Sequence, residues 1–286
     1  MNISVVVATK DRPTELTHLV RRLARILDPG DEVVIVDQSS CENTVVVTES
    51  IPGLHYVYNP KIRNLPEARN QGIHISTQAV VAFLDDDAYP LDDWRDAVQV
   101  ALARHADADG FAGPALEPYR VPLNNWTGGT GIVVTSIGRV RRNMIGRLIT
   151  EDVCSAGGCN MVFRRSALEQ VGGFDARFGG PSLFEEVDLC YRLGRRGSRV
   201  RWIPEMRVVH TVKPSGGTRT EASDRIYWRG HNLGLFMAKN RRRHVLLAGL
   251  VQFGILIMKH ALGMNRLDRA MGFARGYLEG AQCRHE

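Results

Sequence analysis

The 286-residue sequence lacks the cysteine patterns that mark metal-binding and disulfide-stabilised domains. Its five cysteines are odd in number and scattered, and none forms a CxxC pair: Cys41, Cys154, Cys159, Cys190 and Cys283. We therefore expect neither a structural zinc site nor a disulfide framework. A reducing compartment, the cytoplasm, is the default for such a chain.

The sequence also has little that resembles a leader or a membrane span. Residues 1–13 contain no basic n-region and no long apolar h-region, so no secretory signal is expected. The apolar run Val245–Met258 has fourteen residues, fewer than the roughly twenty that a bilayer-spanning helix needs. With 44% hydrophobic and 24% charged residues, the chain is typical of a globular protein with one large α/β domain, or of two small domains.

Charge is distributed unevenly along the chain. The net charge of +6 divides into −7 for residues 1–189 and +13 for residues 190–286. This asymmetry indicates that the C-terminal third faces an anionic partner. No zinc finger, basic zipper or RNP-like aromatic motif accompanies the arginines, so we do not expect a nucleic acid. An anionic membrane surface fits better.

Three consecutive carboxylates, Asp85–Asp87, follow the apolar run Ala79–Leu84. The end of a buried strand is an expensive place for them unless a cation or hydrogen-bond donors stand opposite. Mg²⁺ and Mn²⁺ take such oxygen ligands and often hold a substrate diphosphate through the same ion. The alternative is an acidic loop whose last aspartate caps a helix that starts near Leu91.

The first hundred residues alternate strand, loop and helix. Strands are expected over Ile3–Ala8, Glu32–Val36, His55–Tyr58 and Val80–Leu84, and helices over Glu15–Leu27 and Pro66–Ser76. This alternation predicts an α/β fold with a parallel, doubly wound sheet. In such sheets ligands bind at the carboxyl ends of the strands, where the polar residues are Thr9, Asp11, Asp37 and Asp85–Asp87. Three strands therefore direct polar groups at one crevice.

Four segments stand in a specific order: VVVATKDRP (5–13), NLPEARNQGI (64–73), FLDDDAYP (83–90) and the stretch from GGCNMVFRR to FEEVDLCYRL (within 157–197). With them the chain resembles the family 2 glycosyltransferases, inverting enzymes of GT-A fold that use nucleotide-diphosphate sugars. The resemblance implies a Rossmann-like, mostly parallel sheet flanked by helices. It assigns residues 1–212 to this domain, with a nucleotide-binding half (1–110) and an acceptor half (111–212). A basic helical extension, 213–286, follows.

The resemblance also implies roles at the donor site. Thr9 and Asp37 would hydrogen-bond the nucleobase, and Asp11 belongs to the same donor-binding set. Arg69 would lie beside the base, near the diphosphate. Lys10 is a further candidate for a phosphate contact, although a solvated loop residue is the alternative.

A metal ion is implied by the same resemblance. Asp85 or Asp86 would bind the ribose, and Asp87 would ligate the Mg²⁺ or Mn²⁺ that bridges the two phosphates. His210, at the end of an expected strand, matches a position that supplies a further metal ligand in some relatives. A structural histidine is the alternative there.

The general base is expected in Glu185-Glu186-Val187-Asp188, near a helix start. An acceptor hydroxyl that attacks the anomeric carbon needs a base in hydrogen-bond reach. The resemblance assigns this role to Glu186, with Asp188 as supporting residue or alternative. Many relatives carry Asp where this chain has Glu186. The competing interpretation is that the glutamates favour a helix N-terminus through its dipole.

The basic tail is the last feature. Residues 239–244 read KNRRRH before the apolar run 245–258, and Lys259, Arg266 and Arg269 follow it. This pattern favours a helix that lies in the plane of an anionic membrane, with 239–269 as the contact. There are two alternatives: a helix packed on the catalytic domain or on a homodimer partner, and a helix that spans the membrane. Trp126 and Trp228 are candidates for stacking on sugar rings or for core packing.

We therefore expect a metal-dependent inverting glycosyltransferase that uses a UDP- or dTDP-linked sugar. Its acceptor would be a hydroxyl of a glycan or lipid-linked molecule in cell-surface polysaccharide synthesis, on the cytoplasmic side and peripheral to the inner face of the membrane. A nucleotidyltransferase is an alternative, but residues 9–13 lack the glycine of its phosphate loop. A non-catalytic sugar-nucleotide or membrane-binding module, which would not need Glu186, is another.

Overall fold

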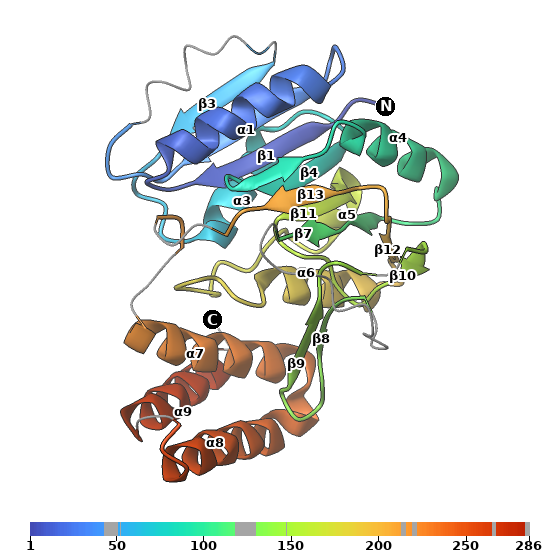
Figure 1. Ribbon diagram of the computed structural model, residues 1–286. Helices are drawn as coiled ribbons and strands as arrows, with labels where there is room; N and C mark the ends of the chain where they lie inside the picture. The colour runs from blue at the N-terminus through green and yellow to red at the C-terminus, as the bar shows by residue number, and fades with distance from the viewer. Residues whose placement is uncertain are drawn as a thin grey trace.

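The computed structural model describes residues 1–42, 51, 53–117, 130–146, 148–212, 216–218, 222–264 and 267–283. Trp126 and Arg266, named above, lie outside these residues. A central twisted sheet with helices packed against it forms the upper part of the molecule, and three C-terminal helices form a separate layer below it (Figure 1). The α/β, GT-A-like architecture expected from the sequence is confirmed.

The central sheet has eight strands in spatial order β10-β12-β6-β11-β4-β1-β2-β3. Their bounds, in that order, are Glu151–Asp152, Val200–Trp202, Gly110–Ala112, Asn160–Arg164, Val80–Asp85, Ser4–Thr9, Glu32–Asp37 and Leu54–Tyr58. β4, β1, β2 and β3 run parallel to one another, as the strand–helix alternation predicted. β11 runs antiparallel to both of its neighbours, so the sheet as a whole is mixed.

Helices cover both faces because the strands are apolar on both sides. In β1, Val5 and Val7 pack in one core with α1 (Pro13–Ile26) and α4 (Trp94–Arg104). Val6 packs in the opposite core, against α3 (Leu65–Ile75), α5 (Arg165–Gln170) and α6 (Glu185–Gly194). A strand buried on both faces reads as a continuous Val/Ile run, which is why this region was readable from the sequence.

A small sheet closes the end of the acidic strand. It has the order β5-β13-β7, with β5 at Ala88–Pro90, β13 at Val208–His210 and β7 at Ala115–Leu116. The register places His210 opposite Ala88, directly after the aspartate triplet. The alternative in which Asp87 caps a helix is wrong, because β5 intervenes and α4 begins at Trp94. A hairpin of β8 (Gly131–Val134) and β9 (Val140–Asn143) extends toward the C-terminal helices.

The C-terminal helices are α7 (Ala222–Asn240), α8 (Val245–Ala261) and α9 (Leu267–Gln282), with a 3₁₀ turn at Arg242–His244. Glycines let α7 and α9 pack backbone to backbone. A Cβ on Gly230 would lie 2.2 Å from the carbonyl oxygen of Phe273, and one on Gly276 would lie 2.2 Å from that of Tyr227. Such small-residue contacts are also frequent between helices in membranes.

Helix α8 is longer than its apolar run suggested. The helical stretch Arg242–Ala261 has 20 residues and is long and apolar enough to cross a membrane by length and composition, and almost none of it is buried. Helix α8 itself has 17 residues and the longer stretch includes Arg242, Arg243 and Lys259, so the expectation that the apolar run is too short to span stays a prediction.

Two glycines of α9 give a matched test of the α7–α9 contact. Gly276→Ala would lower the free energy of unfolding by about 1–3 kcal/mol, because the added methyl group meets the α7 backbone. Gly272→Ala meets nothing within 4 Å and would raise it by roughly 0.5–1 kcal/mol through helix propensity. Urea unfolding of both variants measures the difference, and equal effects would contradict the packing described here.

Candidate functional site

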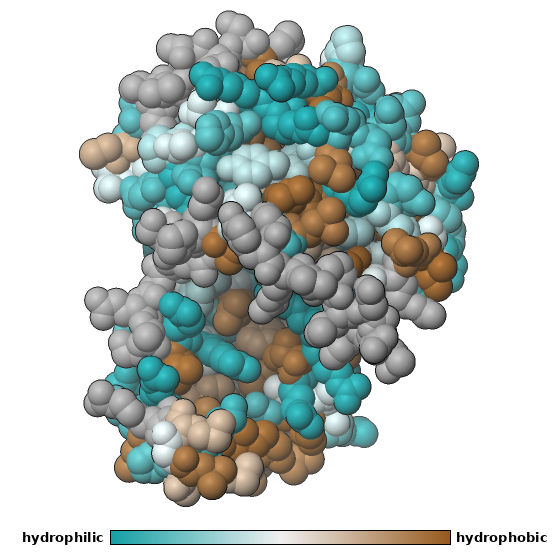
Figure 2. All heavy atoms as spheres, viewed as in Figure 1, coloured by the Kyte–Doolittle hydropathy of each residue, from teal (hydrophilic) through white to brown (hydrophobic). Residues whose placement is uncertain are grey.

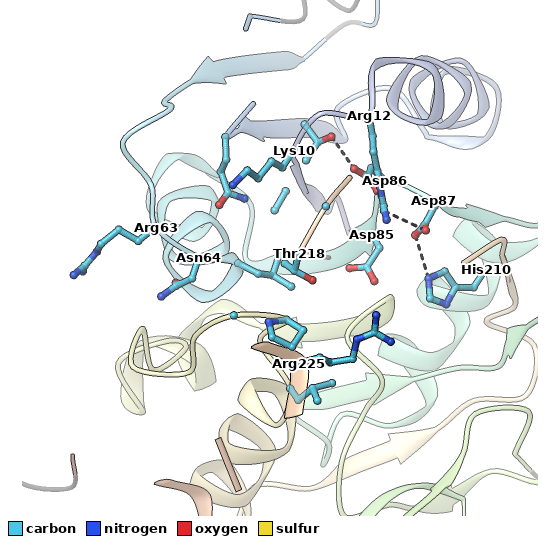
Figure 3. A pocket seen from close by; sticks show the side chains of 18 residues that line it. Lys10, Arg12, Arg63, Asn64, Asp85, Asp86, Asp87, His210, Thr218 and Arg225 are labelled. Atoms are coloured by element: carbon cyan, nitrogen blue, oxygen red, sulfur yellow. Dashed lines mark hydrogen bonds and ion pairs between the residues drawn. The ribbon is translucent and has the colours of Figure 1, made fainter. Parts of the chain in front are cut away.

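A cavity of about 400 Å³ lies at the carboxyl ends of β1 and β4. Of the residues predicted for the site, five line it: Thr9, Asp85, Asp86, Asp87 and His210. Four cationic side chains also line it: Lys10, Arg12, Arg63 and Arg225. Figure 3 shows Asp85 and His210 on one wall of the cavity and Arg225 extending toward them from another element. The strand-end argument thus located the crevice, which joins acidic and basic walls.

Asp86 is turned into the protein. It is buried, and it accepts hydrogen bonds from Thr9 Oγ1 at 2.7 Å and from Arg12 Nη1 at 2.7 Å. Burial raises the pKa of Asp86 to about 6, although Arg12 and Thr9 act to lower it. These bonds oppose the expected contact of Thr9 with a nucleobase and of Asp86 with a ribose. Both residues instead fix the position of Arg12.

Asp87 links two cationic groups. Its Oδ1 lies 3.1 Å from His210 Nε2, and its Oδ2 lies 3.2 Å from Arg12 Nη1. Burial acts to lower the pKa of His210, but the hydrogen bonds with Asp87 and Cys159 and the charge of Asp85 raise it to about 11. The site therefore attracts positive charge, whether as a proton on His210 or as a divalent cation.

The residues that could ligate a metal ion include the predicted His210, but the best-placed carboxylate is Asp85 and not Asp87. Ligand atoms of Asp85, Cys159 and His210 all lie within 4.8 Å of one another. Carboxylate oxygens and imidazole suit Mn²⁺, whereas a thiol suits softer ions. Asp85, expected at the ribose, therefore joins His210 as the better-placed ligand. Asp87, expected as the ligand, holds the imidazole, as carboxylates do for metal-binding histidines.

Arg69 is a buried bridge and does not line the cavity. It donates to Asp85 Oδ1 at 3.1 Å, to Glu185 Oε1 at 2.9 Å and to the carbonyl oxygen of Gly158 at 2.9 Å. Its expected place beside the nucleobase is not supported. The bridge connects the end of β4 to the first turn of α6, so the acidic triplet and the Glu185-Glu186 pair belong to one network.

Glu185 and Glu186 lie next to each other in the first turn of α6, and Arg69 pairs with Glu185 at 2.9 Å. Burial and the neighbouring carboxylate of Glu186 raise the pKa of Glu185 well above its ordinary value. Oε2 of Glu186 is buried and has no hydrogen-bond partner within the part of the chain that the structure describes. Oε2 of Glu185 is buried without a partner in the same way, and a hydrogen bond with the Glu186 side chain contributes to the raised pKa of Glu185, which favours a proton held between the two carboxyl groups. Glu186 is not among the residues that line the cavity, and its role as base stays a prediction.

Asp188, the alternative base, has a structural role. It is fully buried, with three donors around it: Arg192, Lys239 and Asn240, at 2.7, 2.9 and 2.8 Å. A carboxylate held by three donors fits the supporting role expected for Asp188 better than that of a base, and its assignment as base stays an untested alternative. Asp188 ties α6 to the end of α7.

Asp11 and Asp37 also serve the framework. Asp37 is fully buried and accepts from Ser39 N at 2.8 Å and from Tyr56 Oη at 2.7 Å. Asp11 accepts from the backbone N–H and the hydroxyl of Ser40 at 2.9 and 2.8 Å, and these bonds lower its pKa. Neither side chain lines the cavity; they hold the β1 and β2 loops together. Gln38, the neighbour of Asp37, does line it.

The sequence analysis did not predict that α7 contributes residues to the cavity and to the loop beside it. One face of this helix carries five residues that recur every three or four positions: Arg225, Trp228, Asn232, Phe236 and Lys239. Arg225 lines the cavity, and Trp228 covers Gly179 and Gly180, where a Cβ would lie within 2.5 Å of the indole ring. This is a packing role for Trp228. Because the contacting residues lie far apart in sequence, the one sequence signal for this contact is the three-to-four-residue spacing of the side chains on α7.

The loop before α6 is held in a strained conformation by that face. Asn232 Nδ2 donates to the Gly179 carbonyl at 3.0 Å, and Phe236 stacks on Phe184 with ring centroids 6.1 Å apart. Ser182 and Phe184 have φ of 49° and 77°, which is unusual for residues with a Cβ. Such strain persists where surroundings enforce it, commonly at functional sites. The loop leads directly into Glu185 and Glu186.

The fold is GT-A, and the site is a cavity with facing acidic and basic walls. The chain belongs to glycosyl transferase family 2, because the model of that family matches residues 4–172. A second model, glycosyl transferase family group 2, matches residues 103–268 and so includes α7 and α8.

Individual proteins agree with this assignment. A pre-mycofactocin glycosyltransferase of Mycobacterium tuberculosis is 27% identical over 221 residues, 73% of this chain and 42% of that protein. A glucosyl-dolichyl phosphate glucuronosyltransferase of Haloferax volcanii is 26% identical over 252 residues, 81% of this chain and 76% of that protein. The chain thus spans less than half the length of the mycobacterial relative.

A solved structure has the same fold. The mannosyltransferase PcManGT of Pyrobaculum calidifontis, in complex with GDP-Man and Mn²⁺, aligns with a TM-score of 0.61 and 16% identity, over 99% of this chain and 86% of that one. At this identity the likeness shows the fold alone.

The raised pKa of Asp86 gives a pH-dependent prediction. The folded protein binds this proton more tightly than the unfolded chain, so the linked stability is fully present below pH about 3.8 and is lost as the pH rises through about 6. Asp86→Asn removes the titrating group. We expect the unfolding free energy of the wild type, relative to Asp86→Asn, to fall over this interval. Urea unfolding at several pH values measures it, and parallel curves would contradict the assignment.

Proposed function

We propose that this protein is a metal-dependent, inverting glycosyltransferase that moves a sugar from a nucleotide-diphosphate donor to a hydroxyl of a glycan or lipid-linked acceptor. The observation that carries the proposal is that one cavity is lined both by Asp85 and His210 and by the cationic side chains Lys10, Arg12, Arg63 and Arg225. A diphosphate needs cations around it, and a divalent ion beside it needs carboxylate and imidazole ligands. The relatives' names, which specify glycosyl transfer, support the same class.

The donor half of the mechanism follows from charge. Asp85 and His210 would hold Mg²⁺ or Mn²⁺, which acts as a Lewis acid for the charge on a departing diphosphate. Arg12, fixed by Asp86 and Asp87, and the exposed Arg225 would contact phosphate oxygens. The GDP-Man and Mn²⁺ in the PcManGT structure support this kind of donor and ion. UDP- and dTDP-linked sugars remain the donors that we expect from the sequence.

The acceptor half requires a base. Glu186 would accept the proton of the attacking hydroxyl at its unpartnered Oε2, in a single displacement that inverts the anomeric centre. Glu185, with its raised pKa and its bond to Arg69, would orient the first turn of α6. We place the protein on the cytoplasmic side, in cell-surface glycan synthesis; the polyprenyl-type substrate in the name of the Haloferax relative supports a lipid-linked acceptor.

Glu186→Gln tests the base. Release of nucleoside diphosphate from a panel of UDP-, dTDP- and GDP-linked sugars should fall by about 10²–10⁴-fold, because the amide cannot accept the proton. Nucleotide binding, measured by calorimetry, should be unchanged. The control is Glu169→Gln, on the exposed side of α5. NMR of the first-formed sugar should show the inverted anomer; retained configuration, or full turnover by Glu186→Gln, would refute the mechanism.

Asp85→Asn tests the metal site. We expect at least about tenfold weaker Mn²⁺ binding in the presence of nucleotide, because the neutral amide oxygen of asparagine replaces an anionic carboxylate ligand. The electron paramagnetic resonance signal of free Mn²⁺ measures the affinity. Asp92→Asn, at a carboxylate 89% exposed, is the matched control. Equal affinities in both variants would exclude Asp85 as a ligand.

A further inference from the structure

The α8–α9 hairpin exposes an apolar surface that the catalytic site does not use. Its large exposed side chains are Leu246, Leu247, Leu250, Met258, Leu262, Met264, Leu267, Met271 and Leu278. Leu246, Leu250 and Leu262 are 77%, 72% and 67% exposed. Figure 2 shows this hydrophobic surface along the lower edge of the molecule, over α8 and α9. Soluble proteins rarely leave so large a continuous apolar surface in water.

Basic residues border this surface. Exposed cationic side chains flank it at both ends of α8 and along α9: Arg242, Arg243, Lys259, Arg269 and Arg275. No aspartate or glutamate occurs in residues 225–267, so α8 carries no acidic side chain, whereas on α9 Asp268 precedes Arg269 and Glu279 pairs with Arg275. Apolar groups rimmed by Lys and Arg complement a bilayer with anionic headgroups: the leucines enter the boundary region, and the cations meet phosphates.

The opposite side of α8 is held by protein. Gln252 Nε2 donates to the carbonyl of Ile137 in the β8–β9 hairpin at 3.0 Å, and Ala248 is buried against Gly138. Tyr277 of α9 donates to the Val245 carbonyl at 2.6 Å. A helix with one side bound to protein and one apolar, exposed side suits a position in the membrane plane. A spanning helix would place the hairpin, with Arg141 beside it, at hydrocarbon depth.

We propose that α8 and α9 form a platform that binds an anionic bilayer in its plane. The platform is rigidly joined to the rest of the protein through the α7–α9 glycine contacts. Lys239 anchors α7 through Asp188 at 2.9 Å, and Arg225 on the same helix lines the cavity. The inference stands without the proposed chemistry, because it rests on the exposed surface alone.

Vesicle co-sedimentation of the full chain tests the platform. We expect binding to phosphatidylcholine vesicles that contain about one-third phosphatidylglycerol, and much weaker binding to phosphatidylcholine alone. Leu246→Gln/Leu250→Gln should weaken binding by at least about tenfold. Arg242→Gln/Arg243→Gln should weaken it by about thirtyfold, from roughly 1 kcal/mol for each arginine.

Matched variants carry the same chemical changes elsewhere. Leu148→Gln changes a leucine that is 93% exposed, and Arg21→Gln/Arg25→Gln changes two exposed arginines of α1, at the far end of the molecule from α8. Both should bind vesicles like the wild type. All of the substituted side chains are exposed, so circular dichroism and the unfolding temperature should be unchanged and loss of binding cannot be attributed to misfolding.

Three results would overturn the proposal. One is equal binding of the α8 and control variants. Another is a dimer, seen by sedimentation equilibrium, that Leu246→Gln/Leu250→Gln dissociates while no variant binds vesicles; a second copy would then cover the surface. The third is vesicle-bound protein that resists extraction by alkaline carbonate, which would indicate a spanning helix.

Discussion

Burying carboxylates at the end of the core strand β4 costs free energy that only nearby cations offset, and the site is organised around this constraint. Asp86 and Asp87 are satisfied by Arg12 from the β1 loop, and Asp87 also by His210 from β13. Asp85 is paired with Arg69 from α3, which reaches on to Glu185 in α6. Segments from four parts of the chain therefore meet because the triplet requires them. Asp85, Asp87 and His210 all line the cavity, where we propose that a divalent cation binds.

The sequence predicted the parts of the fold that repeat a simple pattern. The Val/Ile runs of β1, β2 and β4 and the helix expected over Pro66–Ser76 were readable because each is a local signal; the Asn64 cap of α3 was not predicted. The crevice was also predictable, since parallel strands end at one edge. The roles of individual residues were not predictable. Asp86, Asp188 and Arg69 are of residue types that also serve in catalysis, and only their tertiary partners show that they support the framework. For the same reason the sequence favoured Asp87 over Asp85 as the metal ligand.

The C-terminal extension is where prediction from sequence was weakest and where the structure adds most. Its basic and apolar character was evident. Its participation in the cavity was not, because Trp228 and Asn232 act through contacts with a loop some fifty residues away, at Gly179 and Gly180. Helix α7 carries out both tasks: one face holds the strained loop before Glu186, and its glycines seat α9. A surface partner of α8 and α9 would thus be connected through α7 to the loop before α6.

The central claim is that the acidic and basic walls together bind a nucleoside diphosphate through a divalent metal ion. A thermal-shift screen of UDP, dTDP and GDP, each with Mn²⁺, with Mg²⁺ and with a chelator, tests it most directly. The account predicts that at least one nucleotide raises the unfolding temperature with metal and has little effect with chelator, since binding to the folded state alone stabilises it. If no nucleotide stabilises the protein in a metal-dependent way, the account is contradicted.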